Sequence, residues 1–320
     1  MSDPRDQVDP ELLPLLDLWP QLTLDETTLP LLRQPGRLPL GEIVNPERVE
    51  RGEAVVPGRD GAPDVALVHY RPAGRAGELL PCIYHIHGGG YVAGTAGSLE
   101  PIHRAMVERL DCAIVSVEYR LAPETVFPGP LEDCYAGLLW LFANAEKLGV
   151  DARRIGLRGE SAGGGLAAAL ALLARDRGEV TPAFQQLIYP MLDDRTCTAD
   201  PHPHAGRLVW NHGSNCFGWR SYLGGEPGSD GVSPYAAAAR AEQLGGLPPA
   251  FVATGSIDLF VDEDIAYAAR LIRAGVATEL HVYPGGFHAF DVDPAADIAV
   301  RMRRDSLHWL ARHLRPAAAN

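Results

Sequence analysis

Gly159-Glu160-Ser161-Ala162-Gly163 is the stretch that decides the fold of this chain. It follows the strand-like residues 154–158 and precedes an alanine- and leucine-rich segment, residues 162–175, with helical spacing. A strand, a sharp turn and a helix in this order present the central serine as a nucleophile. The turn needs glycine on both sides because larger side chains would collide. The structural alternative is a glycine-rich turn with a helix-capping serine. We predict that Ser161 is the nucleophile.

Short apolar runs alternate with helical segments on both sides of this turn. Repeated units of this kind indicate an α/β fold with a largely parallel, doubly wound sheet. A turn-rich segment, residues 57–61, predicts a hairpin at the edge of the sheet, between residues 53–56 and 64–71. The other predicted strands are residues 82–86, 113–117, 155–157, 186–189, 250–253 and 279–283, and the predicted helices are residues 131–147, 162–175, 262–273 and 294–313.

Two stretches break this alternation, residues 1–48 and a loop-rich insertion at residues 193–225. We predict that they pack together as a small helical cap over a catalytic core made of residues 49–192 and 226–320. Insertions at the carboxyl ends of parallel strands shape ligand pockets. The insertion carries the aromatic side chains Trp210, Phe217, Trp219 and Tyr222.

The charge of the chain excludes several classes of partner. Its 320 residues include 28 basic and 41 acidic side chains, a net charge of -13, which repels nucleic acid and anionic membranes. We expect neither a secretory signal nor a membrane-spanning segment. Five cysteines without a CxxC pair indicate reduced thiols, so we expect a cytoplasmic protein. An exposed terminal strand or helix could support a homodimer.

A second glycine-rich motif, His87-Gly88-Gly89-Gly90-Tyr91, directly follows the predicted strand at residues 82–86. Acyl transfer needs preorganised amides that stabilise a tetrahedral oxyanion. We predict an oxyanion hole formed by the backbone N–H groups of Gly88, Gly89 and Ala162. The alternative, a dinucleotide-binding loop, fails on its spacing and lacks an acid about 20 residues later.

A general base must accompany the serine, and this fold has the chain order serine, acid, histidine. Four histidines follow Ser161 outside the insertion, and three of them lie within a predicted strand or helix. His288 instead stands in a glycine-bordered loop after the last strand, where a base can reach the nucleophile. We predict His288 as the base, the alternative being a structural loop histidine. The other three are His281, His308 and His313.

The acid should end the preceding strand, which leads directly to Asp258. Asp262, Glu263 and Asp264 are the alternatives. Their position at the start of a helix explains them as charges that complement the helix dipole. We therefore predict Asp258 as the third member of the triad.

A cluster of His202, His204 and His212, with Cys197 and Cys216 nearby, is the one candidate for a zinc site. The stretch around His202 lacks a regular element that would fix ligand geometry, and a triad needs no metal. We expect neither a metal nor any other cofactor.

The chain resembles the hormone-sensitive-lipase-like (bacterial family IV) esterases. The resemblance covers residues 50–315 and implies an α/β-hydrolase core with a helical cap and no cofactor. It also implies that Ser161, Asp258 and His288 form the triad and that Gly88, Gly89 and Ala162 form the oxyanion hole. The chain departs from the family pattern at Glu160, usually Asp or Thr, and at Gly165, frequently Asn. The motifs are His87-Gly88-Gly89-Gly90-Tyr91, Tyr119-Arg120-Leu121-Ala122-Pro123-Glu124, Gly159-Glu160-Ser161-Ala162-Gly163-Gly164, Asp258 with Asp262 and Glu263, and His288-Ala289-Phe290.

These residues predict a serine carboxylesterase that acts on short- to medium-chain esters. Two alternatives remain at this point. An amidase or peptidase uses the same triad and oxyanion hole. A non-catalytic small-ligand receptor on this fold is the other, although such a receptor would be expected to lack the base.

Overall fold

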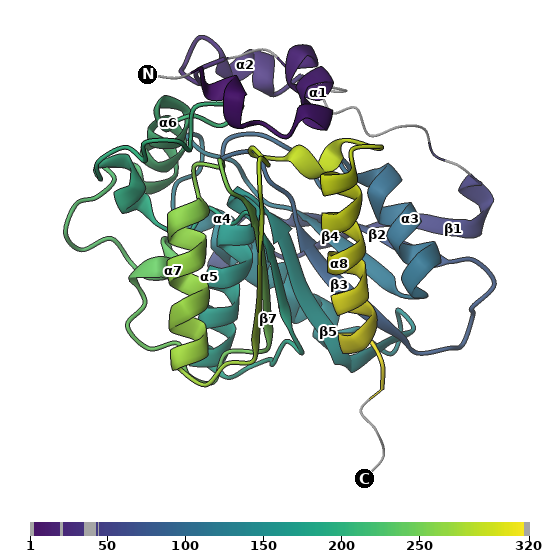
Figure 1. The fold of residues 1–320 in the computed structure, drawn as a ribbon. Coiled ribbons are helices and arrows are strands. Elements are labelled where there is room, and N and C mark those ends of the chain that lie inside the picture. Colours follow the sequence, from purple (N-terminus) through teal and green to yellow (C-terminus); the bar gives the residue numbers. More distant parts are fainter. Residues whose placement is uncertain (1–2, 20–21, 35–42, 44, 317–320) are drawn as a thin grey trace.

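The computed structural model describes residues 3–19, 22–34, 43 and 45–316. Within them one twisted sheet is flanked by helices on both faces (Figure 1). The eight strands are β1 (Val49–Val56), β2 (Val65–Pro72), β3 (Leu80–Ile86), β4 (Ala113–Glu118), β5 (Val150–Glu160), β6 (Gln185–Ile188), β7 (Ala250–Gly255) and β8 (Thr278–Tyr283). The eight α-helices are α1 (Leu13–Leu18), α2 (Leu29–Leu32), α3 (Glu100–Leu110), α4 (Gly129–Ala143), α5 (Ala162–Arg177), α6 (His212–Leu223), α7 (Val261–Arg273) and α8 (Asp297–His313).

The sheet has the strand order β1-β2-β4-β3-β5-β6-β7-β8. The first two strands form the predicted edge hairpin, and β2 also runs antiparallel to β4. All the other neighbours are parallel, which confirms the predicted α/β class. Ile86 pairs with Gly159, and Glu160 pairs with Ile188. The carboxyl ends of β3, β5 and β6 therefore meet at one edge of the sheet.

Successive side chains of the buried strands contribute to two separate cores. In β3, Tyr84 packs into the core that α4, α5 and α7 share with the sheet, whereas Ile83 packs into the core shared with α3 and α8. This alternation follows from the two-residue period of a strand. It explains why these strands read as continuous apolar runs, since both of their faces are covered.

The prediction differs from the structure most in the length of one strand and in one missed helix, and the helix predicted at residues 131–147 is Gly129–Ala143. The strand before Ser161 is predicted at residues 155–157 but extends over Val150–Glu160. Arg153 and Arg154 interrupt the apolar run, and their charges are met by the carboxylate of Asp151 within the strand. The helix α3 is not predicted, although Ile102, Met106 and Leu110 recur at helical spacing and its proline stands in the first turn, where a helix tolerates it.

The insertion is not merely loop-rich, because it contains the helix α6. Asn211 caps its first turn by accepting a hydrogen bond from the amide of Ser214, and Gly224 ends it with a left-handed backbone. Its buried positions have helical spacing, but three of them are polar or glycine, so no apolar stripe marks the helix in the sequence. Gly218 lies against the carbonyl oxygen of Gly90, so the fit of this helix depends on a distant loop.

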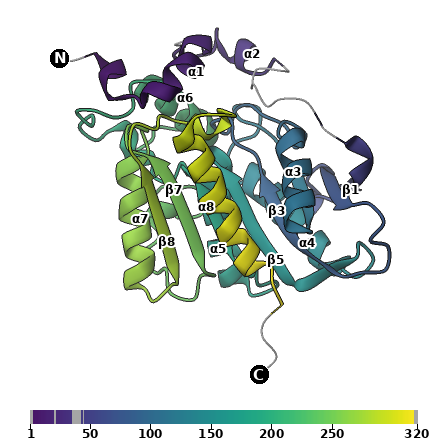
Figure 2. The ribbon, with the colours of Figure 1, turned by 45° about the vertical axis from the view of Figure 1, so that its right-hand side comes forward.

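The amino-terminal helices and α6 lie together beyond the carboxyl edge of the sheet, at the top of Figures 1 and 2. The amide of Leu24 donates to Ser214 Oγ, and Asn211 Nδ2 donates to Thr23 Oγ1. Residues 1–2, 20–21, 35–42 and 44 of the predicted cap lie outside the described residues. No helix of the described part of the chain is long and apolar enough to cross a membrane.

Candidate active site

Ser161 occupies the sharp turn between β5 and α5. Its backbone has φ 56° and ψ -124°, a conformation that non-glycine residues rarely adopt. A Cβ atom on Gly159 would overlap the carbonyl oxygen of Gly163, and one on Gly163 would overlap that of Ile86. The predicted need for both glycines is confirmed. The strain is held by the surrounding backbone, since Ser161 N donates to Ile188 O over 2.9 Å.

The three residues predicted as a triad lie in one hydrogen-bonded line. His288 Nε2 is 2.9 Å from Ser161 Oγ, and His288 Nδ1 is 2.8 Å from Asp258 Oδ2. With Nδ1 donating to the carboxylate, Nε2 is left free to accept the serine proton. The other carboxylate oxygen, Asp258 Oδ1, accepts a hydrogen bond from the amide of Phe260. The carboxylate is thus fixed on both sides.

The line is enclosed by aromatic rings. Tyr189, Trp210 and Phe260 surround the imidazole of His288, with ring centroids 4.8, 6.2 and 5.3 Å from it. Ser161 is 7% and His288 6% exposed. In such surroundings the interaction between the imidazole and Asp258 is screened little by water, which strengthens it.

The alternative acids have different surroundings. Asp262 is exposed at the start of α7, where the helix dipole explains it. That explanation is wrong for Glu263 and Asp264, which are both buried. The carboxylate of Glu263 accepts hydrogen bonds from the amides of Leu192 and Asp193 and from Thr196 Oγ1. Burial raises the pKa of both Glu263 and Asp264.

The loop after β3 is fixed by two side chains. Tyr119 Oη donates to the carbonyl of His87 over 2.9 Å, and His87 Nδ1 contacts the carbonyl of Gly88 over 2.8 Å. Burial lowers the pKa of His87 to about 4, so the neutral ring donates to that carbonyl. Because C=O and N–H point in opposite directions across a trans peptide, these bonds also fix the N–H groups of Gly88 and Gly89.

Gly88 lies directly against the nucleophile. A Cβ atom on Gly88 would come 3.3 Å from Ser161 Cβ, and Gly89 has φ 121°, a backbone angle open to glycine alone. A side chain at Gly165 would overlap the carbonyl oxygen of Met191. The asparagine frequent in the family therefore has no room at this position.

Glu160 belongs to a buried cluster behind the nucleophile. Its carboxylate lies 2.8 Å from His85 Nε2 and 2.9 Å from an Arg158 nitrogen, and His85 Nδ1 contacts Ser116 Oγ. Burial alone would raise the pKa of Glu160, but the charges of His85 and Arg158 outweigh it and lower the pKa to about 2. The longer Glu side chain here thus completes an ion pair inside the core.

We expect Glu160→Gln to lower the free energy of unfolding at neutral pH by about 3 kcal/mol, because Arg158 loses its buried counter-charge. The folded-state pKa of Glu160 lies below its ordinary value of 4.5. Its stabilisation is therefore complete above pH 4.5 and is lost as the pH falls toward about 2. Urea unfolding at about pH 7 and pH 3 measures this, and the gap between wild type and variant should shrink at the lower pH. Equal midpoints at neutral pH would contradict the ion pair.

The histidines of the insertion, His202, His204 and His212, form hydrogen bonds to protein groups through their ring nitrogens. His202 Nδ1 accepts from the amides of His204 and Ala205, and His212 Nε2 contacts the carbonyl of Cys197. His204 Nδ1 lies 2.8 Å from Gln7 Nε2. Nowhere in residues 3–19, 22–34, 43 and 45–316 are three or more His, Cys, Asp or Glu side chains grouped to hold a metal ion.

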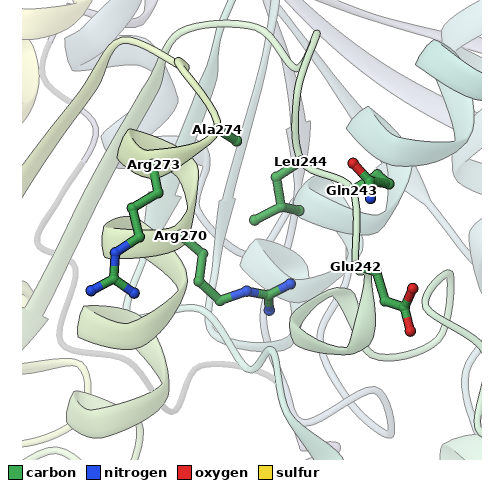
Figure 3. A pocket seen from close by; sticks show the side chains of 6 residues that line it. All are labelled: Glu242, Gln243, Leu244, Arg270, Arg273 and Ala274. Atoms are coloured by element: carbon green, nitrogen blue, oxygen red, sulfur yellow. The ribbon is translucent and has the colours of Figure 1, made fainter.

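A hollow lined by Arg270 and Arg273 lies at the end of α7 that is remote from Asp258 (Figure 3). The Arg270 guanidinium donates to the carbonyls of Ala239 and Ala241. The Arg270 guanidinium is therefore already hydrogen-bonded to backbone carbonyls. The hollow is separate from the triad. The remaining lining residues are Glu242, Gln243, Leu244 and Ala274.

Tyr189 and Phe260 shape the site but are absent from the sequence-based set, in which Glu263 stands only as an alternative acid. Tyr189, Phe260 and Glu263 act through contacts with other elements. Phe260 and Glu263 lie two and five positions after Asp258 in the sequence, so their closeness to Asp258 could have indicated that they lie near the site. Tyr189 directly follows β6, and the parallel pairing of β6 with β5 and β7 brings it to His288.

Comparison with known proteins identifies relatives of this chain. A model of the family described as alpha/beta hydrolase fold matches residues 83–292. The carboxylesterase NlhH of Mycobacterium tuberculosis is 35% identical over 301 residues, covering 91% of this chain and 92% of its own. A solved bacterial heroin esterase has 39% identity and a TM-score of 0.87, covering 98% of this chain and 100% of its own. Esterase LipW from Mycobacterium marinum has 32% identity and a TM-score of 0.82, covering 98% of each chain.

Proposed function

Because this chain belongs to the hormone-sensitive-lipase-like esterases of the α/β-hydrolase superfamily and is a carboxylesterase, we propose that it cleaves short- to medium-chain esters through an acyl-enzyme on Ser161. One observation carries the proposal. Ser161 Oγ, His288 and Asp258 form a continuous hydrogen-bonded line with separations of 2.9 and 2.8 Å. Each member thereby has a role in moving a proton.

Acylation begins when Ser161 Oγ attacks the ester carbonyl and His288 Nε2 takes its proton. The imidazolium donates from Nδ1 to Asp258, whose charge stabilises it. The same Nε2 then returns the proton to the departing alcohol. Tyr189, Trp210 and Phe260 restrict the ring to this orientation.

The negative charge on the carbonyl oxygen needs donors that are already in place. We assign this role to the N–H groups of Gly88, Gly89 and Ala162. The bonds from Tyr119 and His87 to neighbouring carbonyls support the assignment, since they hold the two glycine amides before substrate arrives. Ala162 contributes from the first position of α5, where the helix dipole favours negative charge.

Deacylation repeats these steps with water. His288 takes a proton from a water molecule, whose oxygen attacks the acyl carbonyl, and the proton returns to Ser161 Oγ as the acid leaves. An amide substrate would follow the same route with an amine as leaving group. Rate measurements on an acyl ester and its matching anilide separate the two activities, and we expect the ester to be strongly preferred.

We assign the cap to residues 1–48 and 193–225. The bonds of Ser214 and Asn211 to residues 22–24 support this assignment. Trp210 is a cap residue beside the triad, since a Cβ atom on Gly90 would overlap its indole and its ring lies 6.2 Å from that of His288. Val209, just before it, has φ 61°, a strained conformation for a β-branched residue. The backbone is strained where it places this indole.

We expect activity on p-nitrophenyl esters to fall steeply from the short and medium chains toward palmitate, because Trp210 closes the space beside the triad. Trp210→Ala should raise the ratio of kcat/KM for the octanoate ester over the acetate ester by about tenfold, since the removed indole leaves room for added methylenes. The measurement is kcat/KM along the acetate-to-palmitate series for the wild type and the variant.

Trp210→Phe is the matched control, because it keeps an aromatic ring at the position and should shift the preference less. Thermal unfolding of both variants separates a change of pocket from a loss of structure. An unchanged octanoate-to-acetate ratio in a folded Trp210→Ala protein would remove Trp210 from the pocket. Wild-type activity that peaks at palmitate would contradict the proposed substrate class.

A further inference from the structure

Two of the five cysteines meet where the insertion contacts the core. Cys197 ends the short 3-10 helix Asp194–Cys197, and Cys216 lies in the second turn of α6. Cys216 Sγ is 3.8 Å from the carbonyl oxygen of Cys197, and Cys197 Sγ accepts a hydrogen bond from Nδ2 of Asn215, the neighbour of Cys216. Both residues are half-buried free thiols. The other three cysteines, Cys82, Cys112 and Cys134, are fully buried in the sheet and helix cores.

The surroundings give the two sulfur atoms different reactivity. His212 lies one helical turn before Cys216, with its ring nitrogens 3.7 Å from Cys216 Sγ, and its side chain is exposed. This imidazole can take the Cys216 proton, and the thiolate is the form that attacks oxidants. Burial and the contact with Cys216 raise the pKa of Cys197. Cys197 therefore stays protonated until the second step.

We propose that Cys197 and Cys216 are a modification site, at which a peroxide forms a reversible disulfide that ties α6 to the segment after β6. In the first step the Cys216 thiolate attacks hydrogen peroxide, the O–O bond breaks, and a sulfenic acid and hydroxide form. In the second step Cys197 sulfur attacks the sulfenic sulfur, its proton leaves with the hydroxyl as water, and the S–S bond forms. The proton that His212 took from Cys216 converts the hydroxide of the first step to water, so two thiols are oxidised and one peroxide is reduced to two waters.

The two sides of the pair are anchored to different parts of the protein. Asp194 is ion-paired with Arg240, and Thr196 donates to the buried carboxylate of Glu263, so the Cys197 side is fixed to the core. On the other side Asn215, next to Cys216, contacts Cys197 Sγ and accepts from the indole of Trp210. The disulfide closes a loop between positions 19 apart that contains Trp210, and such a closure restricts the unfolded chain.

The test is peroxide treatment of the purified, reduced full-length protein, followed by alkylation of the remaining thiols and mass analysis. We expect a loss of about 2 Da in one disulfide-linked peptide pair containing Cys197 and Cys216, with Cys82, Cys112 and Cys134 alkylated after denaturation. The oxidised protein should unfold several degrees higher than the reduced one, and dithiothreitol should reverse both changes.

Cys197→Ser and Cys216→Ser should each lose the mass change and the thermal shift. If the half-buried serine hydroxyl destabilises the Cys197→Ser protein, Cys197→Ala replaces it in the test. His212→Gln should form the same link more slowly, because the proton acceptor of Cys216 is gone. An unchanged mass in the peroxide-treated wild type, a link between other cysteines, or stable oxygen adducts on Cys216 without a link would each overturn the proposal.

Discussion

Ester hydrolysis is expected to fall by at least about 10⁴-fold in kcat when Ser161 is replaced with alanine, while the folded state is retained. The hydroxyl is the atom that attacks, and its hydrogen-bond partner in the structure is His288 Nε2. Alanine keeps the Cβ atom, so the strained turn and its contact with Gly88 are unchanged. Initial rates on the acetate ester and a thermal unfolding curve measure the two expectations.

Ser98→Ala is the matched control. The hydroxyl of this serine accepts a hydrogen bond from the amide of Thr95 and lies outside the hydrogen-bonded line of Ser161, His288 and Asp258. Its replacement should leave kcat near the wild-type value. A serine-directed organophosphate should add once to the wild type, at Ser161, and not to the Ser161→Ala protein. Labelling at Ser98 or Ser256, or turnover near wild type in Ser161→Ala, would assign the nucleophile elsewhere.

The turn around Ser161 could be predicted from the sequence because most of its causes are local. Gly159 is required by the carbonyl of Gly163 within the same turn, and the flanking strand and helix are recognisable as apolar runs, whereas Gly163 is required by the carbonyl of Ile86 in β3. Asp258 and His288 could also be predicted, because each follows a strand that is recognisable in the sequence. Parallel strands bring their carboxyl ends to one edge, so chain order was enough to predict that the three side chains meet.

The missed features depend on distant contacts. The helix α6 is placed by aromatic packing against the oxyanion loop, with the ring of Tyr222 stacked 4.1 Å from that of Tyr91, but the rest of its buried face is polar or glycine and shows no apolar stripe. The burial of Glu263 is set by amides of the segment after β6, about 70 positions earlier in the chain. From the sequence alone Glu160 resembles a surface residue, because its buried partner His85 lies on another strand, β3. The periodicity of a helix or strand is visible in the sequence, whereas contacts between residues far apart in the chain are not.

Asp258→Asn is expected to lower kcat by about 10⁴-fold with little change in KM. The carboxylate now accepts two hydrogen bonds, from the amide of Phe260 at Oδ1 and from His288 at Oδ2. An asparagine side chain has one acceptor oxygen, and the bond from Phe260 N–H will hold it. The amide nitrogen then faces His288 Nδ1 and donates to it, so the ring proton moves to Nε2. In that tautomer Nε2 cannot take the proton of Ser161.

Asp262→Asn is the control for this prediction, because it makes the same chemical change four positions away on an exposed side chain. It should leave kcat within about twofold of the wild type, since an exposed charge near a helix start contributes only about 0.3–1 kcal/mol. The measurement is kcat and KM for both variants on one ester, with labelling by the organophosphate as a second readout. Asp258→Asn should label far more slowly at Ser161 while its thermal unfolding stays close to that of the wild type. If Asp262→Asn proved the more damaging change, the acid would belong to the helix start of α7, and Asp258 would be a residue that only holds the turn before it.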